Sequence, residues 1–305
     1  MDQIRQMQVF IQVMESGNFT RAAEALNVPR STVSTLIQAL EDRLRVQLLR
    51  RTTRRMIPTA EGFQFLKTAR DIVDAIEASE QMFRPAVSQR LKGRLRIDMP
   101  SRIGRRIIMP ALPSLIEMHP EVELEVSMTD RLVDMISEGI DCVIRVGDLS
   151  NSELVCRKLG EVQIITCASP AYLERCGTPQ SPDDLSEHLL VNYAPRFPTG
   201  PATWTYRAQD KLNVVNMSSV IAVNNVEGYL AAARAGLGLI QIPAFDVQDL
   251  IERDALVEVL PRFRAPSMPL SFLYARRRNV PMRIQVFQNW ASDLLRREGV
   301  FGSAS

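Results

Sequence analysis

The sequence is poor in the residues that most enzymes use for catalysis and metal binding. It has two histidines, His119 and His188, in 305 residues, and neither lies close to a cysteine in the sequence. The four cysteines are 14, 11 and 9 positions apart, so no CxxC or Cys/His pattern gives the spacing of a metal site. A phosphate-binding loop and a G-x-S-x-G elbow are also missing. These absences argue against an enzyme and against a bound metal or cofactor.

Long apolar runs are absent as well. No segment approaches the roughly 20 apolar residues that a membrane-spanning helix needs. The N-terminus also lacks the basic and then apolar stretch of a secretory signal. Apolar residues still make up 46% of the chain, enough for the cores of the two or three domains that this length suggests. We expect a soluble cytoplasmic protein without membrane contact.

The cysteines are expected to be reduced, partly buried thiols, as is usual in such a compartment. The alternative is a redox-sensing pair among Cys142, Cys156, Cys167 and Cys176. In that case Cys176, which precedes Gly177, is the most exposed candidate.

Charge is distributed unevenly along the chain. The formal net charge is only +2, which by itself does not favour contact with nucleic acid. Residues 1–95, however, contain 15 Lys and Arg against 10 Asp and Glu, a balance of +5 that leaves −3 for the rest of the chain. DNA-binding proteins neutralise phosphates with basic side chains. The positive N-terminal part is therefore the expected site of DNA contact.

Residues 18–37 have the pattern of two short helices joined by a tight turn. Asn18 or Thr20 would cap the first helix. Pro29 fits the start of the second helix, where a missing N–H does no harm. That second helix has a regular apolar stripe, formed by Val33, Leu36, Ile37, Leu40 and Leu44. The pattern predicts a helix-turn-helix, whose second helix enters the major groove of DNA.

A basic segment follows the second helix. Six arginines fall within thirteen positions, and no acidic residue occurs between Asp42 and Glu61. Two short strand-like pieces, 46–50 and 55–57, flank a basic tetrapeptide. A basic hairpin at this place is a wing, which contacts the DNA backbone or the minor groove. The cluster argues against an ordinary helical hairpin with a solvated polar face, so residues 1–58 are predicted to form a winged helix-turn-helix.

A long amphipathic helix is expected after the wing, with Thr59 as its N-cap and Pro85 near its end. Its apolar stripe consists of Phe65, Ala69, Ile72, Ile76 and Phe83, with Leu66 and Val73 beside it. Because a domain of 58 residues cannot cover a stripe of this length, we expect the helix to pair with the same helix of a second subunit, as in a coiled coil. Burial against the chain's own C-terminal part is the alternative. Residues 91–93 are expected to form a short hinge.

From Arg94 onward strands and helices alternate. The strand-like segments are 95–99, 123–128 and 142–146, and the segments 103–118 and 131–138 between them resemble helices. This order predicts a mostly parallel sheet with helices on its faces.

A second unit begins near Val162, and the end of the chain, with a strand at 269–274 and a helix at 282–297, returns to the first. The second unit contains strands near 162–168, 220–223 and 237–242 and a helix at 226–235. Two lobes joined by two crossing strands predict a periplasmic-binding-protein-like domain with a ligand cleft between the lobes. The expected fold class is α/β overall, with the winged helix-turn-helix and a linker helix in front.

These motifs, taken in order, resemble those of LysR-type transcriptional regulators along nearly the full chain. The N-terminal motifs are Phe19-Thr20-Arg21-Ala22-Ala23, Ser31-x-x-Ser34-x-x-Ile37-x-x-Leu40-Glu41, Leu48-x-x-Arg51-Thr52-x-Arg54 and Thr59-x-x-Gly62. The C-terminal ones are Pro110-x-Leu112 with Pro120, Asp141-x-x-Ile144-Arg145-x-Gly147 and Ala233-x-Ala235-Gly236-x-Gly238-x-x-x-x-Pro243. Leu49 departs from the phenylalanine that the family usually has there.

The resemblance implies a sequence-specific regulator that dimerises through the long helix and acts on RNA polymerase. Two such dimers commonly assemble into a tetramer in this family. The regulator's DNA would be an interrupted palindrome rich in A·T. By position, the base and phosphate readers would be Pro29, Arg30, Ser31, Thr32, Ser34 and Thr35. Thr20 and Arg21 would contact the backbone, and Arg51 with Arg54 would form the wing contacts. Thr35 stands where the family commonly has a long polar side chain, so no base preference is carried over.

A small-molecule effector, for which an anion is one candidate class, would bind between the lobes. Open α/β sheets bind ligands at the loops after their strands, where hydroxyl groups and helix N–H groups meet anions. The candidate residues are Ser101, Arg102, Ile103, Thr129, Arg145, Asn224 and Pro243. Two alternatives remain. The polar side chains could simply cap helices, which applies to Ser101, Thr129 and Asn224. The arginines could form a solvated face instead of binding a carboxylate, which applies to Arg102, Arg105 and Arg106.

The expected domains are the winged helix-turn-helix at 1–58, a linker and dimerisation helix at 59–90 and an effector-binding domain at 91–305. Within the last, lobe I would span about 91–162 and 268–305, and lobe II about 163–267. Three alternatives stay open for this architecture. They are a switch by cysteine oxidation, action without an effector, and a helix-turn-helix that contacts protein instead of DNA.

Overall fold

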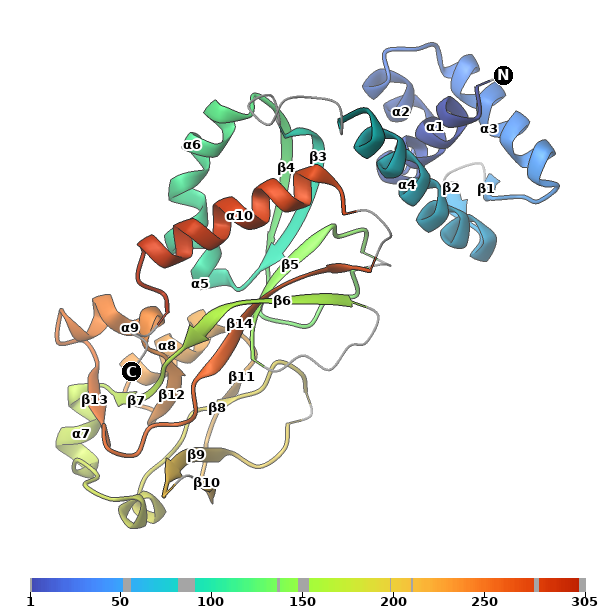
Figure 1. The fold of residues 1–305 in the computed structure, drawn as a ribbon. Coiled ribbons are helices and arrows are strands. Elements are labelled where there is room, and N and C mark those ends of the chain that lie inside the picture. The colour runs from blue at the N-terminus through green and yellow to red at the C-terminus, as the bar shows by residue number, and fades with distance from the viewer. Residues whose placement is uncertain are drawn as a thin grey trace. The chain divides into compact units, whose positions relative to one another are not determined.

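The structure is a computed structural model, in which residues 2–51, 56–81, 91–135, 138–147, 154–197, 199–209, 211–276 and 280–301 are described. The chain divides into two compact units (Figure 1). The N-terminal unit consists of Met1–Gln89 and Arg277–Gln285, and the C-terminal unit of Arg90–Arg276 and Val286–Ser305. No helix in the described part of the chain is long and apolar enough to cross a lipid bilayer.

Three helices and a short hairpin form the head of the N-terminal unit. They are α1 (Gln3–Ser16), α2 (Phe19–Ala25), α3 (Arg30–Leu44) and the antiparallel strands β1 (Leu49–Arg51) and β2 (Met56–Pro58). Their shared core includes the predicted stripe of α3 and is formed by Val9, Phe10, Val13, Ala22, Ala23, Val33, Leu36, Ile37, Leu40, Leu48 and Leu49. The described residues thus have the arrangement of a winged helix-turn-helix. Residues 52–55, which include the tip of the expected wing, lie outside the description.

The helix ends of the head follow from local chemistry. Asn18 caps α2, because the backbone N–H of Thr20 donates to its Oδ1 at 2.7 Å. Asn27 in the turn has φ of +51°, a left-handed conformation that asparagine tolerates. Pro29 precedes α3 as its N-cap residue and makes no side-chain capping bond. Asn18 therefore sets the start of α2, and Asn27 with Pro29 sets the tight turn between α2 and α3.

The wing is tied to the end of α3 and to the start of the linker helix. The backbone N–H groups of Leu48 and Leu49 donate to Glu41 Oε1 at 2.8 and 3.0 Å. The Thr59 hydroxyl donates to the Leu48 carbonyl at 3.1 Å and accepts from the Gly62 N–H at 3.0 Å. A Cβ on Gly62 would lie 2.2 Å from that same carbonyl oxygen. These contacts explain the spacing of Thr59 and Gly62 and confirm Thr59 as the N-cap.

The linker helix, α4 (Ala60–Gln81), packs on α1. Ala69 and Val73 are buried together with Met7, and the ring centroid of Phe65 lies 5.4 Å from that of Phe10. The head therefore covers more of this stripe than the sequence analysis expected.

Apolar surface nevertheless remains on α4. Ile72, from the predicted stripe, is 36% exposed, and Phe63 is 52% exposed. Phe83 and Pro85 lie outside the described residues.

A five-stranded sheet forms the first part of the C-terminal unit. Its order is β4 (Glu121–Met128), β3 (Lys92–Met99), β5 (Cys142–Val146), β14 (Met268–Ala275) and β6 (Leu154–Val162). β3 is parallel to both of its neighbours, whereas β14 is antiparallel to both of its own.

The hinge predicted at 91–93 is wrong. Lys92 and Gly93 already belong to β3 and pair with Glu121 and Val122 of β4. Leu91 is fully buried, and its N–H donates to His119 Nδ1 at 3.2 Å. The strand starts three residues earlier than its apolar pattern indicated, because pairing with β4 fixes the backbone there.

A helix in three segments follows β3 without a break. The segments are α5 (Ser101–Ile103), the π-helical turn η2 (Gly104–Ile108) and α6 (Met109–Met118). The π-helical turn lies just before Pro110, whose missing N–H removes the ordinary bond to the Arg106 carbonyl. The predicted helix at 103–118 is therefore correct in extent, with an irregular first half.

The helix predicted at 131–138 is wrong for the described residues of that segment. Arg131 to Met135 form bends and turns, and residues 136 and 137 are not described. Arg131 donates to both carboxylate oxygens of Glu138, at 2.8 and 2.5 Å, and the Asp134 N–H donates to the same group at 3.2 Å. These bonds satisfy the polar groups of a loop that local propensity alone would place in a helix.

A second, antiparallel sheet lies in the other part of this unit, with strand order β12 (Ile240–Pro243), β7 (Ile164–Ala168) and β13 (Val257–Val259). The helices of this part are α7 (Pro170–Cys176), α8 (Val226–Arg234), α9 (Ala244–Ile251) and the 3-10 turn η3 (Pro182–Glu187). The remaining strands are the pair β8 (Asn192–Tyr193) with β11 (Ala222–Val223) and the hairpin β9 (Thr203–Ala208) with β10 (Lys211–Asn216).

We call the part around the five-stranded sheet lobe I and the part around the three-stranded sheet lobe II. The chain passes from β6 of lobe I to β7 of lobe II and returns from β13 to β14. The helix α10 (Met282–Arg297) packs on lobe I, where the ring centroid of Phe287 lies 6.2 Å from that of Phe272. Two lobes joined by two crossings agree with the predicted fold class.

Replacing Gly62 by alanine tests the junction between the wing and α4. The added methyl group would collide with the Leu48 carbonyl, and overpacking of this kind costs about 1–3 kcal/mol. We expect a lower urea midpoint and weaker DNA binding. Gly200→Ala is the control, since nothing lies within 4 Å of the Cβ added there. Equal midpoints for the two variants would show that the junction can relax.

Candidate functional sites

The N-terminus of α3 presents a row of polar and basic side chains to solvent. Pro29, Arg30, Ser31 and Thr35 are exposed, and Thr32 and Ser34 are half-buried. The Thr35 hydroxyl donates to the Ser31 carbonyl at 3.0 Å. Thr20 and Arg21, at the start of α2, are exposed as well. The residues predicted to read DNA therefore lie on the start of each helix of the helix-turn-helix.

A shallow pocket of about 390 Å³ lies between α2 and the start of α3. It is lined by Thr20, Ala23, Glu24, Asn27, Val28, Pro29 and Arg30. The wing contributes Arg50, which is exposed, and Arg51, whose backbone pairs with Met56. Arg54 lies outside the described residues. The pocket lining carries one basic and one acidic side chain, Arg30 and Glu24, so the positive charge that suits a phosphate backbone lies around the pocket, on the exposed Arg21 and Arg50.

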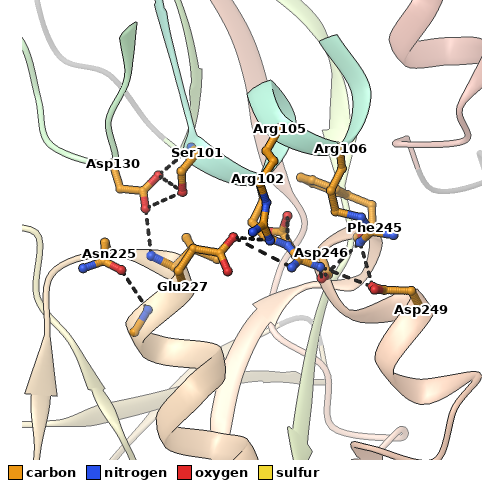
Figure 2. A network of polar contacts seen from close by, with 12 residues as sticks. Ser101, Arg102, Arg105, Arg106, Asp130, Asn225, Glu227, Phe245, Asp246 and Asp249 are labelled. Atoms are coloured by element: carbon orange, nitrogen blue, oxygen red, sulfur yellow. Dashed lines mark hydrogen bonds and ion pairs between the residues drawn. The ribbon is translucent and has the colours of Figure 1, made fainter. Parts of the chain in front are cut away.

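Lobe I reaches lobe II through three arginines (Figure 2). Arg102 donates to the Asp246 carbonyl and, at 3.2 Å, to Asp249 Oδ1. Arg106 donates to the Phe245 carbonyl at 3.2 Å and lies 2.8 Å from Asp249 Oδ1. These contacts join the helix after β3 to the first turns of α9.

Arg105 lies 2.8 Å from Glu227 Oε1 on α8. The carboxylates that meet these arginines are therefore the protein's own. The arginines are neither a uniformly solvated face nor a vacant carboxylate site, the two readings that the sequence had left open.

Two charges of this network are almost completely removed from water. The side chains of Arg102 and Asp246 are each 6% exposed. Arg102 Nε and Asp246 Oδ1 lie 3.9 Å apart, and neither atom has a hydrogen-bond partner. Burial lowers the pKa of Arg102, and burial raises the pKa of Asp246 to about 7 against the opposing effect of Arg102. The Asp246 carboxyl group therefore loses its proton less readily than a solvent-exposed aspartate does, even beside Arg102.

Asp130 makes a second link between the lobes. Its Oδ1 accepts the backbone N–H of Ser101 at 3.0 Å, and its Oδ2 accepts the backbone N–H of Val226 at 2.7 Å. The Ser101 hydroxyl donates to the same carboxylate, at 3.1 Å to Oδ2. Figure 2 shows this carboxylate between the start of α5 and the start of α8. One side chain thus binds the first turn of a helix from each lobe.

A buried network behind this link orders the end of β4. Arg145 of β5 donates to Asp98, which is completely buried on β3, and to the carbonyl of Arg131 at 3.0 Å. The Thr129 hydroxyl donates to both oxygens of Asp98, at 3.1 and 3.0 Å. Arg145 and Thr129 therefore fix the loop that carries Asp130, and their polar groups are already engaged.

The other predicted effector residues have more local roles. Ile103 is completely buried. Asn224 is exposed and accepts a bond from Asn225, and it is Asn225 that caps α8, through the Gly228 N–H at 2.7 Å. Pro243 ends β12 and precedes α9. The structure brings together Ser101, Arg102, Thr129 and Arg145, at and behind the lobe contact.

The acidic half of this network was not among the predicted effector residues. It consists of Asp130, Glu227, Asp246 and Asp249. Their positions in the sequence could have indicated them, since Glu227 and Asp246 lie in the first turns of their helices and Asp130 follows Thr129 directly.

Among the described residues, no group of three or more His, Cys, Asp and Glu side chains is placed to hold a metal ion.

The cysteines divide into two classes. Cys142 and Cys167 are buried, and burial raises the pKa of Cys167 to about 12. Cys156 on β6 and Cys176 at the end of α7 are exposed, as expected for Cys176. The two exposed thiols lie on different lobes.

Two family models match the chain in the order of its units. Residues 4–63 match the bacterial regulatory helix-turn-helix protein of the lysR family, and residues 88–296 match the LysR substrate binding domain. The second match alone covers more than half of the chain.

Related proteins match over nearly their full length. The HTH-type transcriptional regulator YhjC of Escherichia coli is 39% identical over 97% of this chain and 99% of its own. A transcriptional repressor of Pseudomonas aeruginosa is 31% identical, over 96% of this chain and 92% of its own. The transcriptional activator AaeR of Escherichia coli is 29% identical, over 96% and 94%.

Solved structures agree with the sequence matches. CrgA, a LysR-type regulator of Neisseria meningitidis, superposes with a TM-score of 0.60 at 28% identity and covers 95% of this chain and 97% of its own. The Vibrio cholerae virulence activator AphB gives a TM-score of 0.53 at 27% identity, with 95% and 98% covered. The chain therefore belongs to the LysR family of transcriptional regulators, as its motifs predicted, and is a DNA-binding regulator with an effector-binding domain.

Proposed function

We propose that this regulator reads an interrupted palindromic operator with the N-terminus of α3 and the wing. The observation that carries the proposal is the exposed polar and basic row that begins at Pro29, on a head whose apolar residues are otherwise buried. The contact residues are Thr20, Arg21, Pro29, Arg30, Ser31, Thr32, Ser34, Thr35, Arg51 and Arg54. Hydroxyl groups and arginines at the start of a recognition helix suit base edges and phosphates.

A palindrome requires two heads, and α4 is the proposed dimerisation helix. Ile72, which belongs to the predicted stripe and stays 36% exposed, supports pairing of this face with a second copy. Two such dimers would form the homotetramer, with heads on one face of the DNA separated by about 10 base pairs or a multiple. The proposed domains are 1–58 for the head, 59–90 for the linker and 91–305 for the effector-binding part, in a cytoplasmic, nucleoid-associated protein without catalytic function.

The effector is proposed to bind between lobe I and lobe II, near Ser101. The polar links of Arg102 and Asp130 across the lobes support a closure that a ligand can shift. A change of closure would alter the quaternary shape, the spacing of the heads and the bend of the DNA, and so the access of RNA polymerase. Relatives include both a repressor and an activator, so the same architecture suits either outcome.

Selection of genomic DNA fragments by the purified full-length protein tests the proposed function. At near-physiological salt, we expect enrichment of an interrupted palindrome, with affinity that falls steeply as salt rises. Genes beside the enriched sites would identify the regulated pathway. Recovery of fragments without a shared sequence would contradict specific recognition by α3.

Arg30→Ala tests the recognition surface. Loss of a base or phosphate contact should weaken operator binding by about 1–3 kcal/mol, roughly 5- to 150-fold. The measurement is a fluorescence-anisotropy titration at two salt concentrations. Arg253→Ala, which removes an exposed charge from lobe II, is the control and should bind as the wild type does. If Arg30→Ala and the control bind equally well, α3 does not read the operator in the proposed way.

The Asp246 carboxyl predicts a pH dependence of stability. Burial raises its pKa from 3.8 to about 7, the nearby carboxylates Asp130 and Glu227 add to this rise, and Arg102 and Arg106 oppose it. Because the folded pKa is the higher one, the neutral carboxyl stabilises the folded state, and this contribution is lost as pH rises toward 7.

Asp246→Asn stays neutral at every pH. The variant should therefore gain stability relative to wild type as pH rises from 5 to 7, by at most about 1.4 kcal/mol per pH unit, with little further gain between pH 7 and pH 8. Urea midpoints at pH 5, 6, 7 and 8 measure the difference, with the exposed Asp254→Asn as control. Parallel pH profiles for wild type and Asp246→Asn would refute the assignment.

A further inference from the structure

The donors around Asp130 form a site for an anion that both lobes share. The helical run from Ser101 to Met118 offers the Ser101 N–H at its start, and α8 offers the Val226 N–H. Backbone N–H groups in a first helical turn have no partner within the helix and lie at the positive end of its dipole. The Ser101 hydroxyl adds a third donor. A single carboxylate satisfies all three donors.

The occupant of this site is a side chain of the protein itself. Asp130 is placed by its neighbours in the sequence, since Thr129 bonds to Asp98 and the Arg131 carbonyl accepts from Arg145. On α8 the Gly228 N–H is capped by Asn225, which leaves the Val226 N–H to Asp130. The carboxylate is therefore delivered to the lobe contact by a fixed loop.

We propose that Asp130 is an internal ligand, whose carboxylate occupies a carboxylate site built by both lobes and holds the lobes together. The inference rests on the proposed effector cleft and defines its chemistry further. A small carboxylate can fill the same donors only where the Asp130 carboxylate is removed or displaced. This contact between the lobes is consequently made by the protein's own side chain.

Chemical rescue tests this directly. Asp130→Ala removes a group of the size and charge of formate, and sodium formate is the probe, compared with sodium chloride at equal ionic strength. We expect Asp130→Ala to have a lower Tm than wild type and formate to raise it by about 2–4 °C. Formate should leave the wild-type Tm unchanged, because its site is filled.

The distance between the lobes gives an independent readout on the full-length chain. The exposed Cys156 on lobe I and Cys176 on lobe II accept spin labels, whereas Cys142 and Cys167 are buried. Labelled protein diluted with unlabelled protein should give one narrow distance for wild type. Asp130→Ala should give a broader and longer distribution, which formate narrows again.

Two further variants separate the proposal from general destabilisation. Val226→Pro removes the N–H donor of lobe II at the first position of a helix, where proline is favoured, and keeps an apolar side chain where Val226 packs on the core of lobe II. It should lengthen the distance without rescue by formate. Asp184→Ala removes a carboxylate that accepts the Gln180 and Ser181 N–H groups within lobe II, at 2.8 and 2.9 Å. It should show neither a longer distance nor rescue.

Three results would overturn the proposal. They are a wild-type distance in both Asp130→Ala and Val226→Pro, an altered Asp130→Ala on which formate has no effect, and equal rescue of Asp184→Ala. Operator binding measured on the same proteins distinguishes this failure from failure of the proposed function. A variant that binds operator but keeps the wild-type distance contradicts only the role of Asp130.

Discussion

The contact between the two lobes depends on the pairing of a buried guanidinium. Arg102 lies almost completely out of water and meets carboxylate and carbonyl oxygens only across the lobe boundary. A buried ion pair gains little net stability, because desolvation offsets most of the attraction, while breaking one side of it in place is strongly unfavourable. When the lobes separate as a whole, however, water replaces every partner at once. An interface of this polarity is thus suited to opening and closing with a small free-energy difference.

The same reasoning explains why the polar groups of this cleft occur in sets rather than singly. Asp98 has no exposed surface and needs both Arg145 and Thr129 to satisfy its oxygens. That set fixes the loop after β4, and the loop in turn delivers Asp130 to two helix N-termini. Loss of any one member would leave a buried acceptor or donor without a partner, which is costlier than never having buried it.

Much of this architecture follows from local sequence signals, and the exceptions have physical causes. The apolar stripe of α3 and the Thr59 cap were predictable because each depends on residues close in sequence. The two crossings between the lobes followed instead from the order of strand-like and helix-like segments, although β14 pairs with β5 and β6 far along the chain. The false helix at 131–138 arose because side-chain bonds from Arg131 to the nearby Glu138 stabilise a loop instead. The false hinge at 91–93 arose because a partner farther along the chain decides, namely β4, with which the segment pairs. The acids opposite Arg102 were missed for the same reason, since Asp246 lies 144 positions away in the chain.

The junction at Thr59 gives the head a mechanical property. One hydroxyl binds both the Leu48 carbonyl beside the wing and the Gly62 N–H inside α4, and the absence of a side chain at Gly62 allows the two backbones to touch. Since α4 also packs on α1, the start of α4 is rigidly attached to the head. Rotation of α4 about its own axis would therefore move β1 and β2 with it, so the junction converts a twist of the linker helix into a displacement of the wing.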